Sequence, residues 1–430
     1  MKQTIFLLIS GAFLCSQILF SQVQGDTKQR ARAAHDLGRQ GEPAIPKLAP
    51  YVSDTDLSVR IEAVKSLVDI GGPKTVDLLV KAAGDPDAEM QIRATDGLVN
   101  VYLPGYIKTG ISGNLQRAGN VVKAKFSDTN SQAIDPYVTV RPEVIEALGK
   151  LAVSGATLDS RANACRALGI LRGSAAIPQL GEALHSKDNQ TIYEALIALQ
   201  KIRDPASGER VTFLVRDLDE RVQETAIETA GLLLDKDAAP DLREVIGRTK
   251  NPRIRRAAMS SLAMIADPTD HELFLHSLSD TDEGLRAAGA EGLARLKNPA
   301  DLMTLEKAFE AEHKISPRLA EAFAVVDLGN LDTAQFSSLR YLVDTLNQRT
   351  YQGVALGYLV ELARQAPVRQ AVYPLLTGAT KDEKLNLGTV LARSGDKDSI
   401  PYLQALSMDS DPELAKAGIS DLRTLNSRLP

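Results

Sequence analysis

The sequence predicts an all-α protein, a right-handed α-solenoid of about twelve stacked helix pairs with one irregular insertion. The main observation is a signature that recurs about every 31 residues: an anchor position, a small residue three positions later and a large apolar residue seven positions later. Because the small and large residues are four apart, they share one face of a helix. A fixed period in this range is typical of a solenoid, in which each repeat buries its apolar face against its neighbours.

Eleven anchor positions carry this signature between residues 30 and 415. Most steps between them are 30 to 32 residues long, and the two exceptions are 70 and 67 residues long. Each long step leaves room for one further repeat, so we expect a remodelled repeat between Gln91 and Arg161 and a degenerate one around Tyr351 to Ala363. The anchors are Arg30, Arg60, Gln91, Arg161, Ile192, Gln223, Arg255, Arg286, Pro317, Lys384 and Ala415.

A second helix is expected before the anchored helix of each repeat. A different signature, Ile-Pro-x-Leu, begins at Ile45, Ile177 and Ile400. Proline is well tolerated at a helix start, because the first N–H groups have no intrahelical partner there. Gly-Pro, Asp-Pro and Asn-Pro pairs mark the turns, since they end one helix and admit the next. Each repeat is therefore predicted to be a pair of helices.

These residues resemble the short HEAT-like repeat of bacterial proteins, which is also found in phycobilisome lyases. The resemblance covers nearly all of the chain after residue 26. Over its full length, the chain is also similar to exported bacterial HEAT-repeat proteins. The resemblance implies an α/α superhelix of the armadillo or HEAT type. It implies little about function, because the same scaffold serves binding and catalysis alike.

Residues 1–25 are expected to be a secretory signal peptide, and residues 26–430 the solenoid. Lys2 provides a basic start, residues 5–20 are mainly apolar, and no further charge appears before Asp26. Cleavage is expected after Gly25. An uncleaved anchor is the alternative, but the apolar run is shorter than the roughly 20 residues of a membrane span. Lipidation of Cys15 is not expected, because the small residue that a lipobox places before its cysteine is missing.

Composition argues against a nucleic-acid partner. The chain has net charge −5, no tryptophan and only 4% aromatic residues. It therefore offers neither the positive charge that binds phosphate backbones nor many rings on which bases could stack. After signal removal the only cysteine would be Cys165. Because Cys165 follows the small position of an anchored helix, we expect a buried, inert thiol rather than a reactive one.

No catalytic or metal-binding constellation stands out, and no cofactor is expected. His271 and His276 are five residues apart, so they do not share a helix face as the His-Glu-x-x-His zinc motif requires. The pair His271-Glu272 is similar to those with which a HEAT-repeat iron hydroxylase builds its metal site, but that family needs several such pairs. The alternative function is an enzyme or enzyme subunit, lyase-like or metal-dependent, that acts on an envelope substrate.

Charged residues recur around the anchors. Arginine often occupies the anchor itself, and aspartates stand shortly before it. We expect a ladder of Arg–Asp contacts between adjacent repeats, which would fix their stacking angle. Exposed pairs of this kind contribute only about 0–1 kcal/mol each. The arginines are Arg60, Arg161, Arg255 and Arg286, and the aspartates are Asp54, Asp56, Asp159, Asp280 and Asp282.

The segment 101–141 departs from the repeat and is the best candidate for a contact site. It contains four glycines and three tyrosines, and its five basic residues oppose only two aspartates, a local charge of +3. Loops carry function more often than scaffolds do, and tyrosine and arginine are favoured at interfaces. The alternative is a degenerate repeat with a long connection that the tyrosines tie down. The candidate protein-binding residues are Tyr102, Tyr106, Lys108, Arg117, Lys123, Lys125, Tyr137 and Arg141.

The sequence therefore predicts an exported scaffold or adaptor that mediates protein–protein interaction in the periplasm or cell envelope. The surface built by the anchored helices would provide an extended groove for the partner. The partner is expected to be a protein, and the basic insertion favours one with an acidic surface. Neither nucleic-acid binding nor, once the signal is removed, stable membrane insertion is expected.

Overall fold

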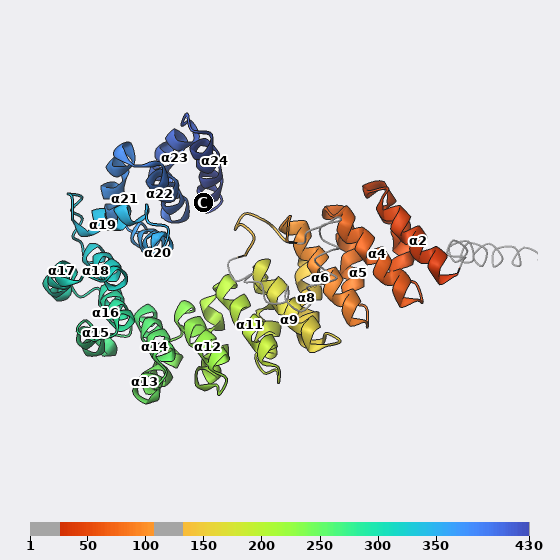
Figure 1. The fold of residues 1–430 in the computed structure, drawn as a ribbon, viewed down its shortest axis with the longest axis horizontal. Helices are drawn as coiled ribbons and strands as arrows, with labels where there is room; N and C mark the ends of the chain where they lie inside the picture. Colours follow the sequence, from red (N-terminus) through yellow and green to blue (C-terminus); the bar gives the residue numbers. More distant parts are fainter. Residues whose placement is uncertain (1–25, 107–131, 430) are drawn as a thin grey trace, which may run out of the picture. The chain divides into compact units, whose positions relative to one another are not determined.

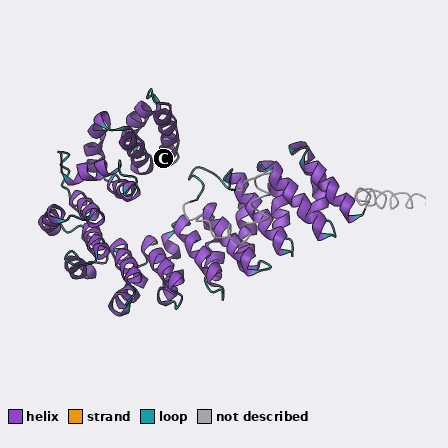
Figure 2. Cartoon of the chain, in the orientation of Figure 1, coloured by secondary structure: helices purple, strands orange, loops and turns teal. Residues whose placement is uncertain are grey.

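A computed structural model describes residues 26–106 and 132–429 of the 430-residue chain. Within these ranges all regular structure is helical: 22 α-helices are joined by short 3₁₀ helices and turns, and no strand occurs (Figure 2). The all-α solenoid predicted from the periodicity is confirmed. None of the helices in these ranges is both long and apolar enough to span a membrane. The predicted signal peptide, residues 1–25, lies outside the described residues.

The chain divides into two compact units. Unit 1 comprises Met1–Ile134 and Val138–Ile202, and unit 2 comprises Asp135–Tyr137 and Arg203–Pro430. In each unit the helices form two rows, one made of the anchored helices and the other of the helices that precede them (Figure 1). The two-helix repeat expected from the sequence is therefore present in both units.

Unit 1 contains five anchored helices, each packed on the next: α2, α4, α6, α9 and α11. The second row is formed by α3, α5, α8 and α10, which also pack in order. The bounds are α2 (Thr27–Gly38), α3 (Ile45–Val52), α4 (Leu57–Ile70), α5 (Val76–Ala83), α6 (Ala88–Tyr102), α8 (Pro142–Ser154), α9 (Leu158–Ile170), α10 (Ile177–Ala183) and α11 (Asn189–Ile202).

The long step between Gln91 and Arg161 does not contain a further repeat. Helix α6 packs directly on α9, and α5 packs directly on α8, so the two rows continue across the step. The prediction of a remodelled repeat here is therefore wrong. The extra residues lie between the end of α6 at Tyr102 and the start of α8 at Pro142.

Unit 2 contains seven anchored helices, and the degenerate repeat expected around Tyr351 to Ala363 is present as α20. Figure 1 shows α14, α16 and α18 along the concave edge of this unit and α13, α15 and α17 along its convex edge. The anchored helices are α12 (Glu220–Leu232), α14 (Pro252–Ile265), α16 (Glu283–Leu296), α18 (Ile315–Asp327), α20 (Gln352–Leu362), α22 (Lys381–Ser394) and α24 (Pro412–Asn426). The preceding helices are η6 (Thr212–Arg216), α13 (Ala239–Arg248), α15 (His271–Ser277), α17 (Leu302–Ala311), α19 (Ser338–Thr345), α21 (Ala366–Val372) and α23 (Ile400–Ser407).

The repeat signature forms the core. From α4 to α22, every small and large signature position is buried, whereas the leucines of the first and last anchored helices, Leu37 and Leu422, are only half-buried. The small position is needed for close approach. A Cβ atom added at Gly418 would lie 2.4 Å from the backbone nitrogen of Ser407, and one at Gly289 would lie 2.8 Å from the carbonyl oxygen of Phe274. The second-row helix therefore packs backbone-close against the anchored helix.

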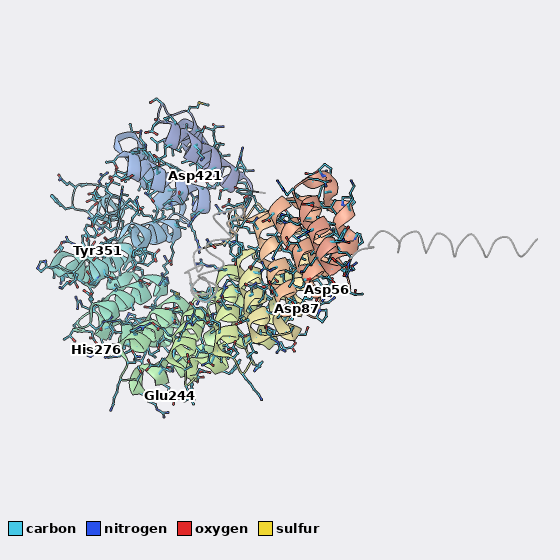
Figure 3. All side chains as sticks on the ribbon, turned by 45° about the vertical axis from the view of Figure 1, so that its right-hand side comes forward. Asp56, Asp87, Glu244, His276, Tyr351 and Asp421 are labelled. Carbon is cyan, nitrogen blue, oxygen red and sulfur yellow. The ribbon has the colours of Figure 1, made fainter. Side chains whose placement is uncertain are left out.

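The predicted Arg–Asp ladder is present in part, and where it occurs it connects an anchored helix to the turn before the next one. Arg30 Nε lies 2.8 Å from Asp54 Oδ2, and Arg60 Nε lies 2.7 Å from Asp85 Oδ2. The second aspartate of each Asp-x-Asp turn, Asp56 or Asp87, caps its own helix by accepting hydrogen bonds from the first N–H groups. Asp56 and Asp87 lie at the same edge of unit 1 (Figure 3).

Two details of the ladder differ from expectation. The pairs of Arg30 and Arg60 are largely buried, with 16% of each arginine side chain exposed, so the value for exposed pairs underestimates them. Arg255, in contrast, is 45% exposed and lies 3.7 Å from Asp280. Arg161 has no carboxylate partner among the described residues. It donates instead to the carbonyl oxygen of Gly155 at 3.0 Å. At Arg286 the acceptor is Glu312, 2.7 Å away, instead of an aspartate.

Candidate functional site

The side of the anchored row that faces away from the second row, which we call its outer side, carries polar side chains at fixed positions of the repeat in unit 1. Two and five residues after the anchor, the helix surface is not needed for packing between repeats, so Glu62 and Lys65 of α4 remain partly exposed. On α6, α9 and α11 the same positions carry most of a connected group, which we call the α9 polar cluster. Its members are Asp96, Tyr106, Asn163, Arg166, Gln190 and Glu194.

Hydrogen bonds between neighbouring helices hold this cluster. The side-chain amide of Asn163 donates to Asp96 Oδ1 at 3.0 Å, which joins α9 to α6. Arg166 pairs with Glu194, which joins α9 to α11, and Gln190 donates to the same glutamate oxygen at 2.7 Å. Only 17% of the Arg166 side chain and 6% of the Glu194 side chain are exposed. The cluster is therefore an ordered, charge-assisted network at a helix surface.

Tyr106, one of the residues predicted from the sequence, belongs to this cluster. Burial raises the pKa of its phenol, and the negative charges of Asp96 and Glu194 act in the same direction, whereas a hydrogen bond with Arg166 opposes them. Tyr106 therefore stays neutral and can donate or accept a hydrogen bond. Cys165 is fully buried, as predicted, and burial raises the pKa of its thiol.

The other described candidates hold the ends of the 101–141 segment. The backbone N–H of Arg141 donates to the Tyr102 hydroxyl at 3.2 Å, and Arg141 Nη2 lies 2.7 Å from Asp77 Oδ1. The backbone N–H of Ile134 donates to the Ile170 carbonyl at 2.9 Å. Both ends of the segment are therefore hydrogen-bonded to the neighbouring helices. This is what the alternative of a long connection held by its tyrosines requires.

Tyr137 lies apart from these contacts and is 43% exposed, and its hydroxyl donates to Asp135 at 2.8 Å. The structure thus brings Tyr102 and Arg141 together and places Tyr106 in the α9 polar cluster. Lys108, Arg117, Lys123 and Lys125 lie outside the described residues, so a binding role for them stays a prediction.

Sequence reasoning missed the polar residues on α6, α9 and α11. Asp96 and Arg166 each lie five residues after an anchor, and Asn163 and Glu194 lie two residues after one. The signal that could have found them is that polar residues recur two or five residues after the anchor in three successive anchored helices. The insertion interrupts the period between two of these helices, which concealed the alignment.

A second network occurs in unit 2, centred on Arg295 of α16. Its Nε and Nη2 atoms lie 2.7 and 2.8 Å from the two oxygens of Glu361, and Nη1 lies 2.9 Å from Glu291. Tyr358 donates to Glu291 at 2.5 Å, and the guanidinium lies over the Phe323 ring at 5.3 Å from its centroid. Burial raises the pKa of Tyr358. Because Tyr358 and Glu361 belong to α20, this network joins α16 to α20.

The histidines do not form a metal site in the described part of the chain. His271 Nε2 lies 2.9 Å from Asp301 Oδ2, and this hydrogen bond raises its pKa. His35 Nδ1 lies 2.9 Å from Glu62 Oε1 at an exposed position. No group of three or more His, Cys, Asp or Glu side chains could hold a metal ion among residues 26–106 and 132–429. The networks observed here are suited to hydrogen-bonded and ionic recognition.

A family model for HEAT repeats matches residues 16–99 and 209–294 of the chain. The chain therefore carries HEAT repeats, as the resemblance predicted. Comparison with curated proteins gives no match.

Three solved structures illustrate the similarity of fold. The complex of CpcE and CpcF of phycocyanin lyase from Nostoc sp. PCC7120 is 16% identical, with 62% of this chain and 92% of that chain covered and a TM-score of 0.36. An engineered protein is 19% identical, with coverage of 89% and 98% and a TM-score of 0.37. Kap121p is 13% identical, with coverage of 90% and 46% and a TM-score of 0.37.

Proposed function

We propose that this HEAT-repeat protein is an exported scaffold that binds a protein partner along the outer side of its anchored helices, in the periplasm or cell envelope. The observation that carries the proposal is the α9 polar cluster. Its side chains are already held in place by their neighbours, so binding would cost little of the entropy that ordering an interface requires. The N-terminal sequence, with its apolar residues 5–20, supports export.

The anchored row also has the extent that a partner-binding surface needs. In unit 1 the row continues without interruption from α2 to α11, so a bound chain could contact several helices in turn. Arg93 of α6 and Lys65 of α4 lie on this side and are 28% and 38% exposed. Each makes only an ion pair within its own helix, with Glu89 and Glu62, so each can turn toward a partner at small cost.

The test is affinity capture from an envelope extract of the native host, with the mature full-length chain as bait. Lys65→Glu with Arg93→Glu reverses two charges on the anchored row. The matched control, Lys81→Glu with Lys150→Glu, reverses two exposed charges on the second row, on α5 and α8. We expect the first pair to reduce capture of the partner and the control to leave it unchanged. Equal capture by both variants would refute the anchored row as the binding face.

The basic insertion is proposed to steer an acidic surface of the partner. Lys123→Glu with Lys125→Glu should then slow association and weaken its dependence on salt, because positive charge raises the rate of encounter with an acidic partner. Tyr106→Ala should lower the melting temperature, because it removes a half-buried ring next to Arg166. Association kinetics and thermal unfolding of both variants separate the steering role of the lysines from the packing role of Tyr106. Unchanged kinetics in the lysine variant would show that the insertion only connects two helix pairs.

A further inference from the structure

A shallow pocket of about 450 Å³ lies between the anchored helices α12 and α14 of unit 2. Helix α12 contributes two glutamates, and α14 contributes two arginines, a serine and a methionine. The pocket is on the outer side of the anchored row of unit 2, because most of its residues lie one, five or nine positions after the anchors Gln223 and Arg255. Its principal side chains are Glu224, Glu228, Arg253, Arg256, Ser260 and Met264.

One carboxylate in this pocket has no partner. Arg253 Nη2 lies 2.6 Å from Glu224 Oε2. Arg256 binds both oxygens of Asp282, with Nε 2.8 Å from Oδ1 and Nη2 2.7 Å from Oδ2. Both arginines are therefore engaged by other acids. Glu228 makes no hydrogen bond or ion pair with any residue in the described part of the chain and remains open to solvent.

The surroundings of Glu228 favour a positively charged group next to it. Neighbouring protein atoms partly desolvate the carboxylate and raise its pKa, and the charge of Glu224 acts in the same direction, although Arg253 opposes them. A cation placed beside Glu228 would offset this cost. The pocket wall also includes Leu232, Ala257 and Met264, which offer apolar contact to the methylene groups of a long side chain.

We propose that the pocket between α12 and α14 binds a lysine or arginine side chain of the protein partner, with the cationic head on Glu228 and the methylene stem on Met264. This inference rests on the proposed scaffold function and names the chemistry that one contact of the partner must have. The Ser260 hydroxyl supplies a second oxygen within the same pocket. Fixed placement of one basic side chain would set the register of the partner along the row.

The pocket can be tested without knowing the partner, by NMR of methyl-labelled methionine in the full mature chain. Five of the six methionines lie after residue 25, so the Met264 signal can be assigned by substitution. The probe is Nα-acetyl-lysine methylamide, and the matched neutral probe carries an additional acetyl group on Nε. We expect the charged probe to shift the Met264 signal and bind at least tenfold more tightly than the neutral one. Equal binding of the two probes, or no shift, would overturn the inference.

Two variants with the same change of charge locate the effect. Glu228→Gln should weaken the charged probe at least tenfold, whereas Glu310→Gln, an exposed site on α17, should leave its binding unchanged. Capture of the partner separates this inference from the scaffold proposal. If Glu228→Gln binds the partner as the wild type does, the pocket inference fails and the scaffold function stands. If no protein is captured while the probe still binds, both the scaffold function and the protein source of the amine are overturned.

Discussion

Helices α9 in unit 1 and α18 in unit 2 hold the same place in the repeat, yet they use their outer sides differently. Two and five residues after its anchor, α9 carries Asn163 and Arg166, which bond to the helices on either side. The same positions of α18 are Leu319 and Ala322, and both are fully buried. A surface in one unit is therefore core in the other.

The difference arises because α16 and α20 meet across α18. Arg295 of α16 binds Glu361 of α20, 66 residues further along the chain, so the contact skips one repeat. The small Ala322 side chain leaves room for this approach. In unit 1 the contacts of the α9 polar cluster extend only to adjacent helices. The simple picture of a solenoid with nearest-neighbour contacts thus describes unit 1 better than this part of unit 2.

The largest expected effect comes from the core position that the two units share. Leu168 of α9 and Leu293 of α16 are both fully buried at the large signature position. Leu168→Ala and Leu293→Ala should each cost about 2–5 kcal/mol, because each leaves a cavity. Hydrogen exchange should show loss of protection confined to α8–α11 for Leu168→Ala. For Leu293→Ala it should extend to α20.

Protection that is lost equally at the ends of unit 1 would contradict this assignment of Leu168. Protection of α20 that is unaffected by Leu293→Ala would mean that the contact across α18 does not couple the repeats. Urea unfolding of both variants supplies the free energies of unfolding. The clearest support for the comparison would be equal losses of free energy, with hydrogen-exchange protection lost over more helices in Leu293→Ala than in Leu168→Ala.

Removal of the cation from each network should have the next largest effect. Arg295→Met leaves the carboxylates of Glu291 and Glu361 without their shared partner and should cost roughly 3 kcal/mol. Arg166→Met should cost less, about 1–2 kcal/mol, because Glu194 keeps its hydrogen bond from Gln190. Thermal unfolding of the two variants measures the difference. A larger loss for Arg166→Met would reverse the ranking of the two networks.

The pH dependence of unfolding should identify a buried acid in unit 2 that lacks a hydrogen-bond partner at one oxygen. Glu321 of α18 is 1% exposed, and its Oε2 atom has no hydrogen-bond partner. Burial raises its pKa to about 8, helped by the charge of Glu312 and opposed by Arg286 and Arg318. The folded protein therefore holds a proton that the unfolded chain releases near pH 4. The contribution of the protonated Glu321 carboxyl to the free energy of unfolding is fully present below that pH. It is lost as the pH rises to 8, at up to roughly 1.4 kcal/mol per pH unit.

Glu321→Gln should remove this loss, so the variant should be more stable than the wild type at pH 8 and similar to it at pH 4. Glu194→Gln in unit 1 should do the opposite and destabilise the protein at pH 8, because it weakens the pair with Arg166. Urea unfolding between pH 4 and pH 8.5 measures both. A Glu321→Gln curve parallel to that of the wild type would show that this carboxyl titrates normally.

The sequence predicted the architecture well because the signature residues are the packing residues. The positions of Leu168 and Leu293 follow from the 31-residue period alone. The 67-residue step between two anchors was long enough for one more repeat, and this predicted the repeat that contains α20. The period predicted one repeat too many at the insertion, because the length of a segment does not show whether it forms a helix pair. The contact across α18 could not be predicted, since it joins positions more than two periods apart.

Glu321, by contrast, left a signal that sequence reasoning did not use. It lies four residues after its anchor, where other repeats have apolar residues such as Val64, Leu196 and Ile227, all fully buried. A glutamate at the core position of one repeat is by itself enough to predict an unusual acid. The partner of the α9 polar cluster has no comparable signal, because the recurrence of polar residues on these helices does not show what they bind.

The smallest expected effect concerns the residue that ends the anchored helices. Eleven positions after the anchor, Gly71 in unit 1 and Ala266 in unit 2 both have a positive φ, of 66° and 54°. Only Ala266 is in the left-handed helical region, with ψ of 51°, whereas Gly71 has ψ of −172°. Glycine enters this region freely, whereas a residue with a Cβ atom pays a steric cost of about 1 kcal/mol. Ala266→Gly should therefore stabilise unit 2 by about 0.5 kcal/mol, because relief of strain outweighs the greater freedom of the unfolded chain.

Gly71→Ala should destabilise unit 1 by at least about 1 kcal/mol, because almost only glycine adopts a φ of 66° together with a ψ of −172°. The nearest atom to an added Cβ is 3.9 Å away, so no steric clash would contribute. Not every such position should respond in the same way. Lys297 also has a left-handed conformation, with φ of 56°, but its ammonium group pairs with Asp327 at the end of α18. Lys297→Gly would lose that contact with the helix C-terminus and should be neutral or destabilising. Urea unfolding of the three variants tests this order, and stabilisation by Lys297→Gly equal to that by Ala266→Gly would show that the ion pair contributes nothing.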